Sequence, residues 1–293
     1  MKTALRSHTW FYHVLAILTV MIWGTTFVST KILINSGLSP VEILFYRFAL
    51  AYICLLLVSH KRFIARSWKD EGLLMLSGLC GGSLYFIAEN TALGITLASN
   101  VSLLICTAPI FTLFLSRLFY KERLRRKMLY GSLIALIGVG MVVLNGSLVL
   151  KINPLGDFLT LIAAIFWALY CLILKQLGGR YSTLFVTRKV FFYGLVSLLA
   201  YLCFFPTDFA LPLLHKPVVY LNLLFLGIVA SMLCYMVWNA AVQVLGASRT
   251  ANYIYINPLV TLLTSALFLS ETLTPVSLLG TACIIGGVYM AER

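Results

Sequence analysis

Apolar runs about as long as a lipid bilayer is thick follow one another along most of this chain. In helical form, about 20 apolar residues cross the hydrocarbon core of roughly 30 Å. Hydrocarbon offers backbone N–H and C=O groups no hydrogen-bond partner, so such runs must be helices that bond internally. Only 11% of the residues are charged, which is too few for an ordinary soluble domain. The sequence therefore predicts an all-α membrane protein.

Ten of these runs are long enough to be transmembrane helices, and no stretch between them is long enough for a separate soluble domain. We expect helices at 14–34, 40–59, 72–90, 97–117, 127–145, 156–175, 183–205, 218–240, 247–268 and 274–291. The first run exceeds the apolar core of a cleavable signal peptide, which is roughly 7–15 residues long. We therefore expect it to remain as the first span.

The stretch 90–141 occurs a second time, without a gap, at 239–290, which is 149 positions later. Eighteen of its 52 positions are identical there, whereas unrelated apolar segments would agree at roughly one position in ten. The first helices of each half match more loosely, with Trp23 aligned to Trp167 and Arg47 to Arg188. The recurrence predicts two halves of five helices each, residues 1–146 and 147–293.

Lysine and arginine gather in the connections on one side of the predicted bundle. Eighteen of the 22 basic residues fall on that side, so by the positive-inside rule this side and both termini are cytoplasmic. These clusters also account for the net charge of +13 without nucleic-acid binding. Because five is odd, the second half would insert upside down: Glu122 lies among arginines, whereas its counterpart Glu271 lies in a connection without any. Inverted repeats of this kind give secondary transporters a structural route to alternating access.

Two tryptophans are the first candidates for a substrate cavity. Trp23 and Trp167 lie near the middle of their helices rather than at the membrane interface, where tryptophan is usually an anchor. A buried indole needs a partner for its N–H, and a hydrated cavity supplies one. The alternative is helix packing. Thr26 and Tyr170 follow three residues later, on about the same helix faces, and share both interpretations.

Three charged residues within or beside the apolar runs are candidates for substrate binding or coupling. Lys31 is near the end of its helix and either snorkels or meets anionic groups of the solute at the outer mouth. Arg47 is about 10 Å into its helix, too deep for easy snorkelling, and has a structural partner or a functional role. Glu89 is a solvated helix end or, if buried, a carboxyl group suited to proton exchange. Arg188 and Lys189 are nearer a helix end and are expected to snorkel.

The polar residues of the later spans give the remaining candidates. Asn90 and Asn239 occupy matching positions and either bind the solute or bridge helices. Pro109 and Pro258 break the backbone ladder of two corresponding helices, a pattern that points to a transport site or to a packing kink. Further candidates for the cavity wall are Tyr85, Tyr235, Tyr255 and Asn257.

Several short motifs occur in the same order in both halves. The first half has Trp23-Gly24-Thr25-Thr26-Phe27, Tyr46-Arg47-Phe48, Ala92-Leu93, Ala98-Ser99, Pro109, Glu122 and Gly131; the second has Trp167, Arg188, Ala247-Ser248, Pro258, Glu271 and Gly280. Over nearly the whole chain, this order resembles the drug/metabolite transporter superfamily, in particular its EamA-type permeases. The resemblance implies that each half is one EamA-like repeat and that ten helices enclose a central cavity. It also implies movement of small organic solutes, often export. Trp167 is followed by Ala168 instead of glycine, so the halves need not contact the substrate equivalently.

These observations together favour a secondary transporter of small organic metabolites such as amino acids. We expect it to be an exporter in the inner membrane of a bacterium, with lipid and a small-molecule substrate as its partners and no cofactor. A monomer is compatible with the sequence, which does not set the oligomeric state. The near alternative is an exporter of cationic compounds, which would need a deep carboxylate beside aromatic rings; only Glu89 is a candidate.

Other classes of function find little support. A primary pump would need a phosphate-binding loop, which the sequence lacks. A membrane-embedded enzyme would need a cluster of catalytic side chains within the spans. The four histidines, His8, His13, His60 and His215, are expected in tails or loops. The seven cysteines lie in apolar runs without a Cys-x-x-Cys pair, so we expect no metal site.

Overall fold

The computed structural model describes residues 2–59, 63–96, 98–121, 125–144, 153–260, 263 and 274–292. Within these ranges all regular secondary structure is helical, and seven helical segments are long and apolar enough to cross a membrane. They are Thr9–Asn35, Pro40–Val58, Trp68–Ile95, Val101–Tyr120, Pro154–Leu177, Thr183–Phe204 and Pro217–Leu245. The prediction of a polytopic helical membrane protein is confirmed. Of the residues on which the prediction of inverted halves relied, Glu122 and Glu271 lie outside the described residues.

The first half of the chain contains α1 (Lys2–Asn35), α2 (Pro40–Val58), α3 (Trp68–Gly78), the π-helical segment η1 (Leu79–Ser83), α4 (Leu84–Ile95), α5 (Ala98–Ile105), α6 (Ala108–Tyr120) and α7 (Arg126–Leu144). The second half contains α8 (Pro154–Leu177), α9 (Thr183–Phe204), the short 3-10 helix η2 (Leu211–Leu213), α10 (Pro217–Leu224), the π-helical segment η3 (Phe225–Leu233), α11 (Cys234–Leu245), α12 (Ala247–Asn252), the 3-10 helix η4 (Tyr253–Ile256) and α14 (Pro275–Glu292). The first helix begins earlier than predicted, so His8 and His13 both lie within α1 and not in a tail. His13 hydrogen-bonds Tyr253.

Polar residues at the ends of the apolar runs explain where several helices begin. Backbone N–H groups in the first turn of a helix have no intrahelical partner, and an N-cap side chain accepts from one of them. Four N-cap side-chain oxygens accept from the backbone N–H three residues later: Ser39 from Glu42 (3.1 Å), Ser67 from Asp70 (3.2 Å), Asn153 from Gly156 (3.0 Å) and Ser182 from Phe185 (3.3 Å). Each therefore helps to fix the first residue of a span.

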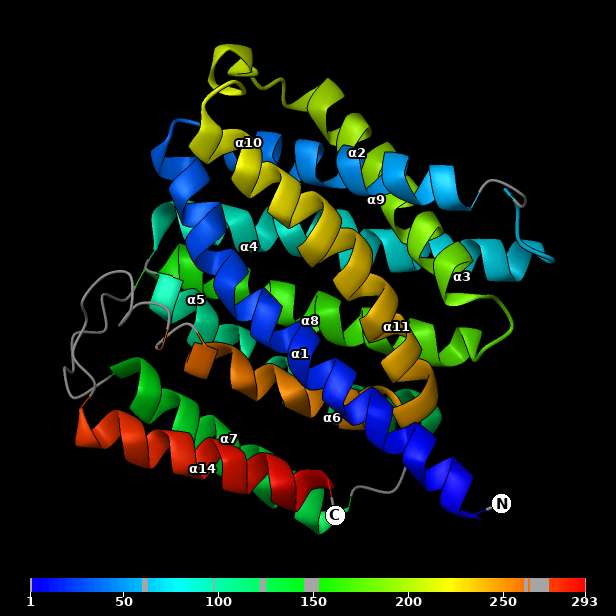
Figure 1. The fold of residues 1–293 in the computed structure, drawn as a ribbon, viewed down its shortest axis with the longest axis vertical. Helices are drawn as coiled ribbons and strands as arrows, with labels where there is room; N and C mark the ends of the chain where they lie inside the picture. The colour runs from blue at the N-terminus through cyan, green and yellow to red at the C-terminus, as the bar shows by residue number, and fades with distance from the viewer. Residues whose placement is uncertain are drawn as a thin grey trace.

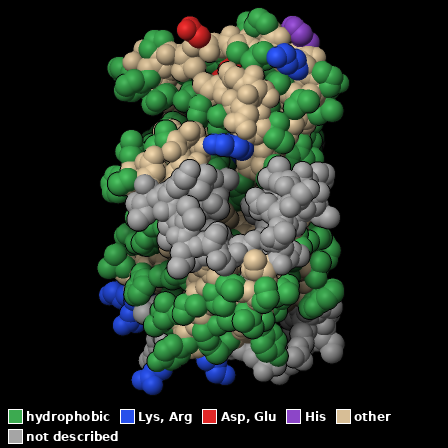
Figure 2. Space-filling view, turned by 90° about the vertical axis from the view of Figure 1, so that its left-hand side faces the viewer, with side chains coloured by type: hydrophobic (Ala, Val, Ile, Leu, Met, Phe, Trp, Pro, Cys, Tyr) green, Lys and Arg blue, Asp and Glu red, His purple; other side chains and the backbone are tan. Residues whose placement is uncertain are grey.

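The helices form a bundle in which segments far apart in sequence lie side by side (Figure 1). In that view α1 runs next to α11, while α7 and α14 form a separate pair along the lower edge. The start of α1, the end of α2, the start of α3 and the α8–α9 connection all lie at the right-hand end of the bundle. Figure 2 looks onto the left-hand end of the bundle of Figure 1, where connections between helices lie; among the described residues in that view, hydrophobic side chains are more numerous than charged ones. Large hydrophobic side chains are also exposed along the helices, for example Leu57, Ile137 and Ile285. Exposed apolar side chains on the spans suit a lipid surround.

Glycines hold α7 and α14 in unusually close contact. A Cβ added at Gly138 would lie 2.6 Å from the carbonyl oxygen of Gly280. One added at Gly287 would lie 2.6 Å from the carbonyl oxygen of Gly131. Both distances are too short for any side chain, so these positions let the two backbones touch, as small residues do between membrane helices.

We expect Gly138→Ala to destabilise the folded protein by about 1–3 kcal/mol, because the added methyl group meets backbone atoms that cannot move independently. Gly140→Ala on the same helix is a matched control, since a Cβ there has nothing within 4 Å. Thermal unfolding of both variants in detergent would test this. Equal melting temperatures for the two would show that α7 and α14 are not packed at this distance.

Candidate functional site

Aromatic side chains from three helices meet in the middle of the bundle. Trp23 of α1 and Trp167 of α8, the two repeat-related tryptophans, touch edge to face with ring centroids 5.2 Å apart. Tyr235 of α11 lies 5.7 Å from the first and 5.9 Å from the second. Trp238 completes the cluster at 5.1 Å from Trp23. The structure thus brings together residues that are 144 positions apart in sequence.

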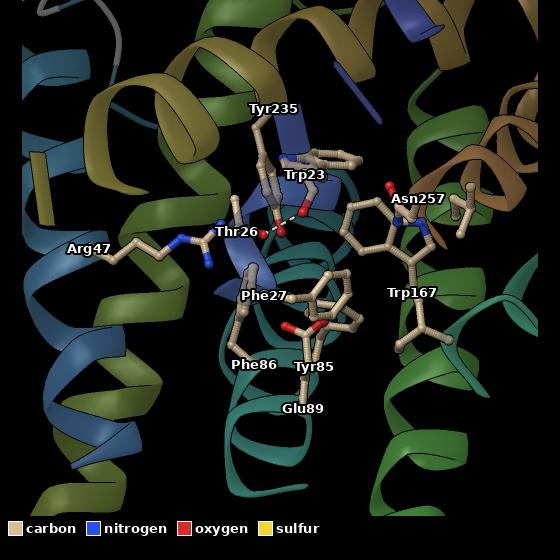
Figure 3. Close-up of a pocket in the computed structure, with 12 residues that line it drawn as sticks. Trp23, Thr26, Phe27, Arg47, Tyr85, Phe86, Glu89, Trp167, Tyr235 and Asn257 are labelled. Carbon is tan, nitrogen blue, oxygen red and sulfur yellow. Dashed lines mark hydrogen bonds between the residues drawn. The ribbon is translucent and has the colours of Figure 1, made fainter. Parts of the chain in front are cut away.

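A small cavity lies beside this cluster (Figure 3). Its volume is about 30 Å³, room for a water molecule or two. Eight of its lining residues were candidates from sequence: Trp23, Thr26, Arg47, Tyr85, Glu89, Trp167, Tyr235 and Asn257. Four others, Phe27, Phe86, Ile105 and Ile254, were not. The cavity is therefore mainly aromatic, with a few polar groups that converge on it.

Two opposite charges face this cavity from different helices. Arg47 is 3% exposed, donates from Nε to Ser231 Oγ at 2.5 Å and lies 4.3 Å from the centroid of Phe86. Glu89 is 6% exposed and accepts a hydrogen bond from Tyr85 at 2.6 Å. Among the described residues, no carboxylate lies within ion-pair distance of the Arg47 guanidinium. Arg47 and Glu89 thus share one cavity without forming an ion pair.

The two π-helical segments supply backbone carbonyls to the aromatic cluster. The Gly81 carbonyl in η1 accepts from the Tyr235 hydroxyl at 2.6 Å, and the Ala230 carbonyl in η3 accepts from Trp23 Nε1 at 2.9 Å. Gly81 and Ala230 are equivalent in the two halves, since their numbers differ by the repeat shift of 149. A π segment alters the regular backbone ladder and is common at functional sites. The cluster is therefore anchored to both halves at corresponding points.

Trp167 is bonded differently from Trp23. Its indole is 5% exposed and lines the cavity. Within the described part of the chain, no group accepts a hydrogen bond from its Nε1. A buried N–H without an acceptor is unfavourable by roughly 1–3 kcal/mol. This donor is therefore available to a molecule that enters the cavity.

The other predicted residues lie outside the lining. Lys31 donates to the Leu93 carbonyl at 2.8 Å, near the C-terminal end of α4, where a positive charge is favourable. Asn90 donates to the Pro40 carbonyl at 3.3 Å. Asn239 links two helices, accepting from Tyr170 at 2.5 Å and donating to Thr187 at 2.9 Å. These contacts bridge helices, and Tyr170 additionally packs against Trp167 with centroids 5.3 Å apart.

The helices that contain the two prolines are interrupted near them. A turn at residues 106 and 107 separates α5 from α6, which has Pro109 in its first turn. The 3-10 segment η4 comes immediately before Asn257 and Pro258, and Tyr255 within it is fully buried. The Ile254 carbonyl, which Pro258 deprives of its helical partner, accepts from Cys106 Sγ at 3.6 Å. The two breaks are thus joined to each other next to the cavity.

Arg188 and Lys189 lie near the start of α9, as the sequence predicted, but other parts of the protein cover them, since they are only 2% and 4% exposed. Lys189 forms an ion pair with Glu71, and Arg188 donates to the Ser59 carbonyl. Their snorkelling to the membrane interface stays a prediction. No group of three metal-binding side chains occurs in the described ranges.

Comparisons with known proteins agree with this arrangement. A model of the EamA-like transporter family matches residues 10–144 and again residues 154–292. A transporter of Archaeoglobus fulgidus is 29% identical, covering 95% of this chain and 96% of its own. A protein of Escherichia coli named "Probable amino-acid metabolite efflux pump" is 28% identical, covering 94% and 93%. One of Streptantibioticus cattleyicolor named "Probable terminal-alkyne amino-acid exporter" is 26% identical, covering 94% and 92%.

A solved crystal structure shares the fold, with a TM-score of 0.75 over 96% of each chain at 17% identity. The family model covers far more than half of the chain, in two successive matches that each include one of the paired tryptophans. Helical spans, an internal cavity and this match lead to one assignment. The chain is a multi-pass membrane protein that belongs to the EamA-like transporter family.

Proposed function

We propose that this protein exports small zwitterionic metabolites, with α-amino acids as the main class, across the inner membrane of a bacterium. The observation that carries the proposal is the pair Arg47 and Glu89, two buried opposite charges on one cavity without an ion pair between them. An α-amino acid carries the complementary pair of charges. The names of the relatives from Escherichia coli and Streptantibioticus cattleyicolor support the same substrate class.

Each part of an amino acid has a matching group in the cavity. The planar guanidinium of Arg47 suits a carboxylate, because it can donate two parallel hydrogen bonds. The Glu89 carboxylate suits the ammonium group, which the faces of Tyr85 and Trp167 also attract. The remaining aromatic wall suits an apolar side chain. Trp167 Nε1 is a buried donor without an acceptor among the described residues. A carboxylate or side-chain oxygen of the bound substrate would accept its hydrogen bond and so offset the free-energy cost of burying it.

The same carboxylate provides a mechanism for coupling to protons. Ionised Glu89 attracts the substrate ammonium, and protonation removes that attraction. A site that holds either a proton or the substrate, and opens to one side at a time, exchanges the two across the membrane. Export would then be driven by proton entry.

We further propose that the chain forms ten helices in two inverted repeats, 1–146 and 147–293, with both termini cytoplasmic. The directions of α1 and α8, which are opposite in Figure 1, support the inversion. So does the α7–α14 pair: Gly131 meets Gly287 while their repeat equivalents Gly280 and Gly138 also meet, as a two-fold axis between the helices requires. Because the cavity now holds only water-sized molecules, substrate entry requires the halves to move apart. The helix breaks at Pro109 and Pro258 are suited to that motion.

Export of cationic compounds is the second candidate, favoured by the aromatic rings around Glu89. The buried Arg47 counts against it, because a second positive charge in so small a cavity would be repelled. The matching family is one of transporters. We therefore propose that this protein is a transporter and not an enzyme.

The proposal is tested with purified protein in proteoliposomes, loaded in turn with radiolabelled amino acids, the corresponding amines and lipophilic cationic dyes. We expect saturable flux of amino acids, stimulated by an opposing proton gradient, and much slower flux of the amines. Flux of the dyes with no flux of amino acids would replace the proposal by its alternative. Lipid vesicles without protein are the control for leakage.

A further inference from the structure

A second cavity, about 310 Å³ in volume, lies where α2 ends and α3 begins. Its walls come from α2, from residues 63 and 64 of the connection, and from α3 and α9. It shares no lining residue with the central cavity. Its position at the ends of spans places it near the boundary between hydrocarbon and water.

The charges in this cavity do not cancel. Lys189 is paired with Glu71, and its Nζ also donates to the Phe63 carbonyl at 2.9 Å. Arg188 has no such partner: among the described residues, none of the carboxylates lies within ion-pair distance of it. Its Nη2 is buried and lacks a hydrogen-bond acceptor in the same part of the chain. One positive charge and one strong donor are therefore left for a ligand.

The rim of the cavity is apolar and exposed. Phe63, Ile64 and Trp68 are 57%, 62% and 84% exposed. Phe63 also lies under the Arg188 guanidinium, 5.0 Å from its carbon to the ring centroid. Tryptophan and other aromatic residues at the membrane interface contact lipid at the level of the headgroups. A ligand that fits both features combines an anionic group with hydrocarbon.

We propose that this cavity binds the phosphate headgroup of an anionic phospholipid, with Arg188 as its counter-ion and Phe63, Ile64 and Trp68 along its acyl chains. Basic pockets between membrane helices bind phospholipid headgroups in this way. A soluble phosphate offers the same charge but makes no use of the apolar rim. The site is separate from substrate binding, so its occupancy is expected to stabilise the protein without being transported.

The test is native mass spectrometry of the full chain in detergent, titrated separately with phosphatidylglycerol, phosphatidylcholine and inorganic phosphate. We expect one phosphatidylglycerol to bind about tenfold more tightly than phosphatidylcholine, as one charged hydrogen bond implies. Arg188→Gln should remove that preference. Lys69→Gln is the matched control, since it removes an exposed positive charge from the start of α3 outside the cavity. It should change the affinity less than about twofold.

A second variant tests the proposal independently, in case Arg188→Gln does not fold. Ile64→Glu places a negative charge on the exposed rim, where it should repel the phosphate while leaving the melting temperature in phosphatidylcholine unchanged. Equal binding of the two lipids by the unaltered protein would overturn the proposal, as would equal losses in Arg188→Gln and Lys69→Gln. Binding of inorganic phosphate that depends on Arg188, without a preference for phosphatidylglycerol, would assign the cavity to a soluble anion and reject the lipid.

Discussion

Replacing Arg47 by glutamine is expected to lower kcat/KM for α-amino-acid export about 10- to 100-fold, which is the contribution of one hydrogen-bonded charge. The guanidinium is buried, lines the central cavity and has no ion-pair partner among the described residues. Glutamine keeps much of the length and can still bond Ser231, but it cannot neutralise a carboxylate. Arg47→Lys should retain part of the activity, because it keeps the charge and loses the planar pair of donors.

Two comparisons separate substrate binding from a structural role of Arg47. Lys31→Gln removes another positive charge from the same half of the chain, but Lys31 lies on α1, bonds the Leu93 carbonyl near the end of α4 and is outside the cavity. Its effect should be less than about threefold. An amine analogue that lacks the carboxylate should be transported slowly by the unaltered protein, and Arg47→Gln should not slow it further, because the variant also removes the positive charge that repels the amine. A larger loss in Lys31→Gln, or an equal loss for the amine, would show that Arg47 does not bind the substrate carboxylate.

The fold could be predicted largely because lipid leaves few alternatives. Apolar runs that must satisfy their own backbone groups are helices, and each of the seven described spans overlaps one predicted range. The internal repeat of the sequence added long-range information, because positions that correspond in its two copies can meet inside one bundle. For this reason the contact of Trp23 with Trp167 could be anticipated from two residues far apart in sequence.

The sequence could not reveal the details that depend on neighbouring helices. Arg47 and Arg188 hold equivalent positions in the sequence repeat. Arg47 lines the central cavity, whereas Arg188 lines the second cavity, between the end of α2 and the start of α3. The π-helical segments were missed because an altered backbone ladder has no strong signature in side-chain pattern. A hint existed in Gly78-x-x-x-Gly82 and its counterpart Gly227-x-x-x-Ser231, which overlap η1 and η3.

The site is less symmetric than the repeat. The position equivalent to Glu89 is Trp238, since 238 minus 89 equals the shift of 149. The first half therefore contributes the carboxylate and the second half an indole at the same place. Among the described residues that line the cavity, Glu89 is the one carboxylate, and the proposed exchange of one proton for one substrate ammonium needs no second. This asymmetry leads to the second large expected effect.

We expect Glu89→Gln to abolish the dependence of export on pH. In the unaltered protein, a fall in pH on the substrate-loading side protonates Glu89, removes its attraction for the ammonium and raises KM. Glutamine resembles the protonated carboxyl group in shape and in its lack of charge, and it can still accept the hydrogen bond from Tyr85. The variant should therefore show a KM raised about 10- to 100-fold that no longer changes with pH. The measurement is KM in proteoliposomes at several pH values without a gradient.

Tyr85→Phe is the matched control, because it removes the hydrogen bond to Glu89 and leaves the carboxyl group in place. It should displace the pH at which KM rises while preserving the rise itself. Stimulation by an opposing proton gradient should likewise persist in Tyr85→Phe and disappear in Glu89→Gln. If Glu89→Gln still responds to the gradient, the coupling proton is carried elsewhere. If its KM is unchanged, the ammonium does not bind at Glu89, and the pairing of opposite charges across the cavity is not the basis of substrate recognition.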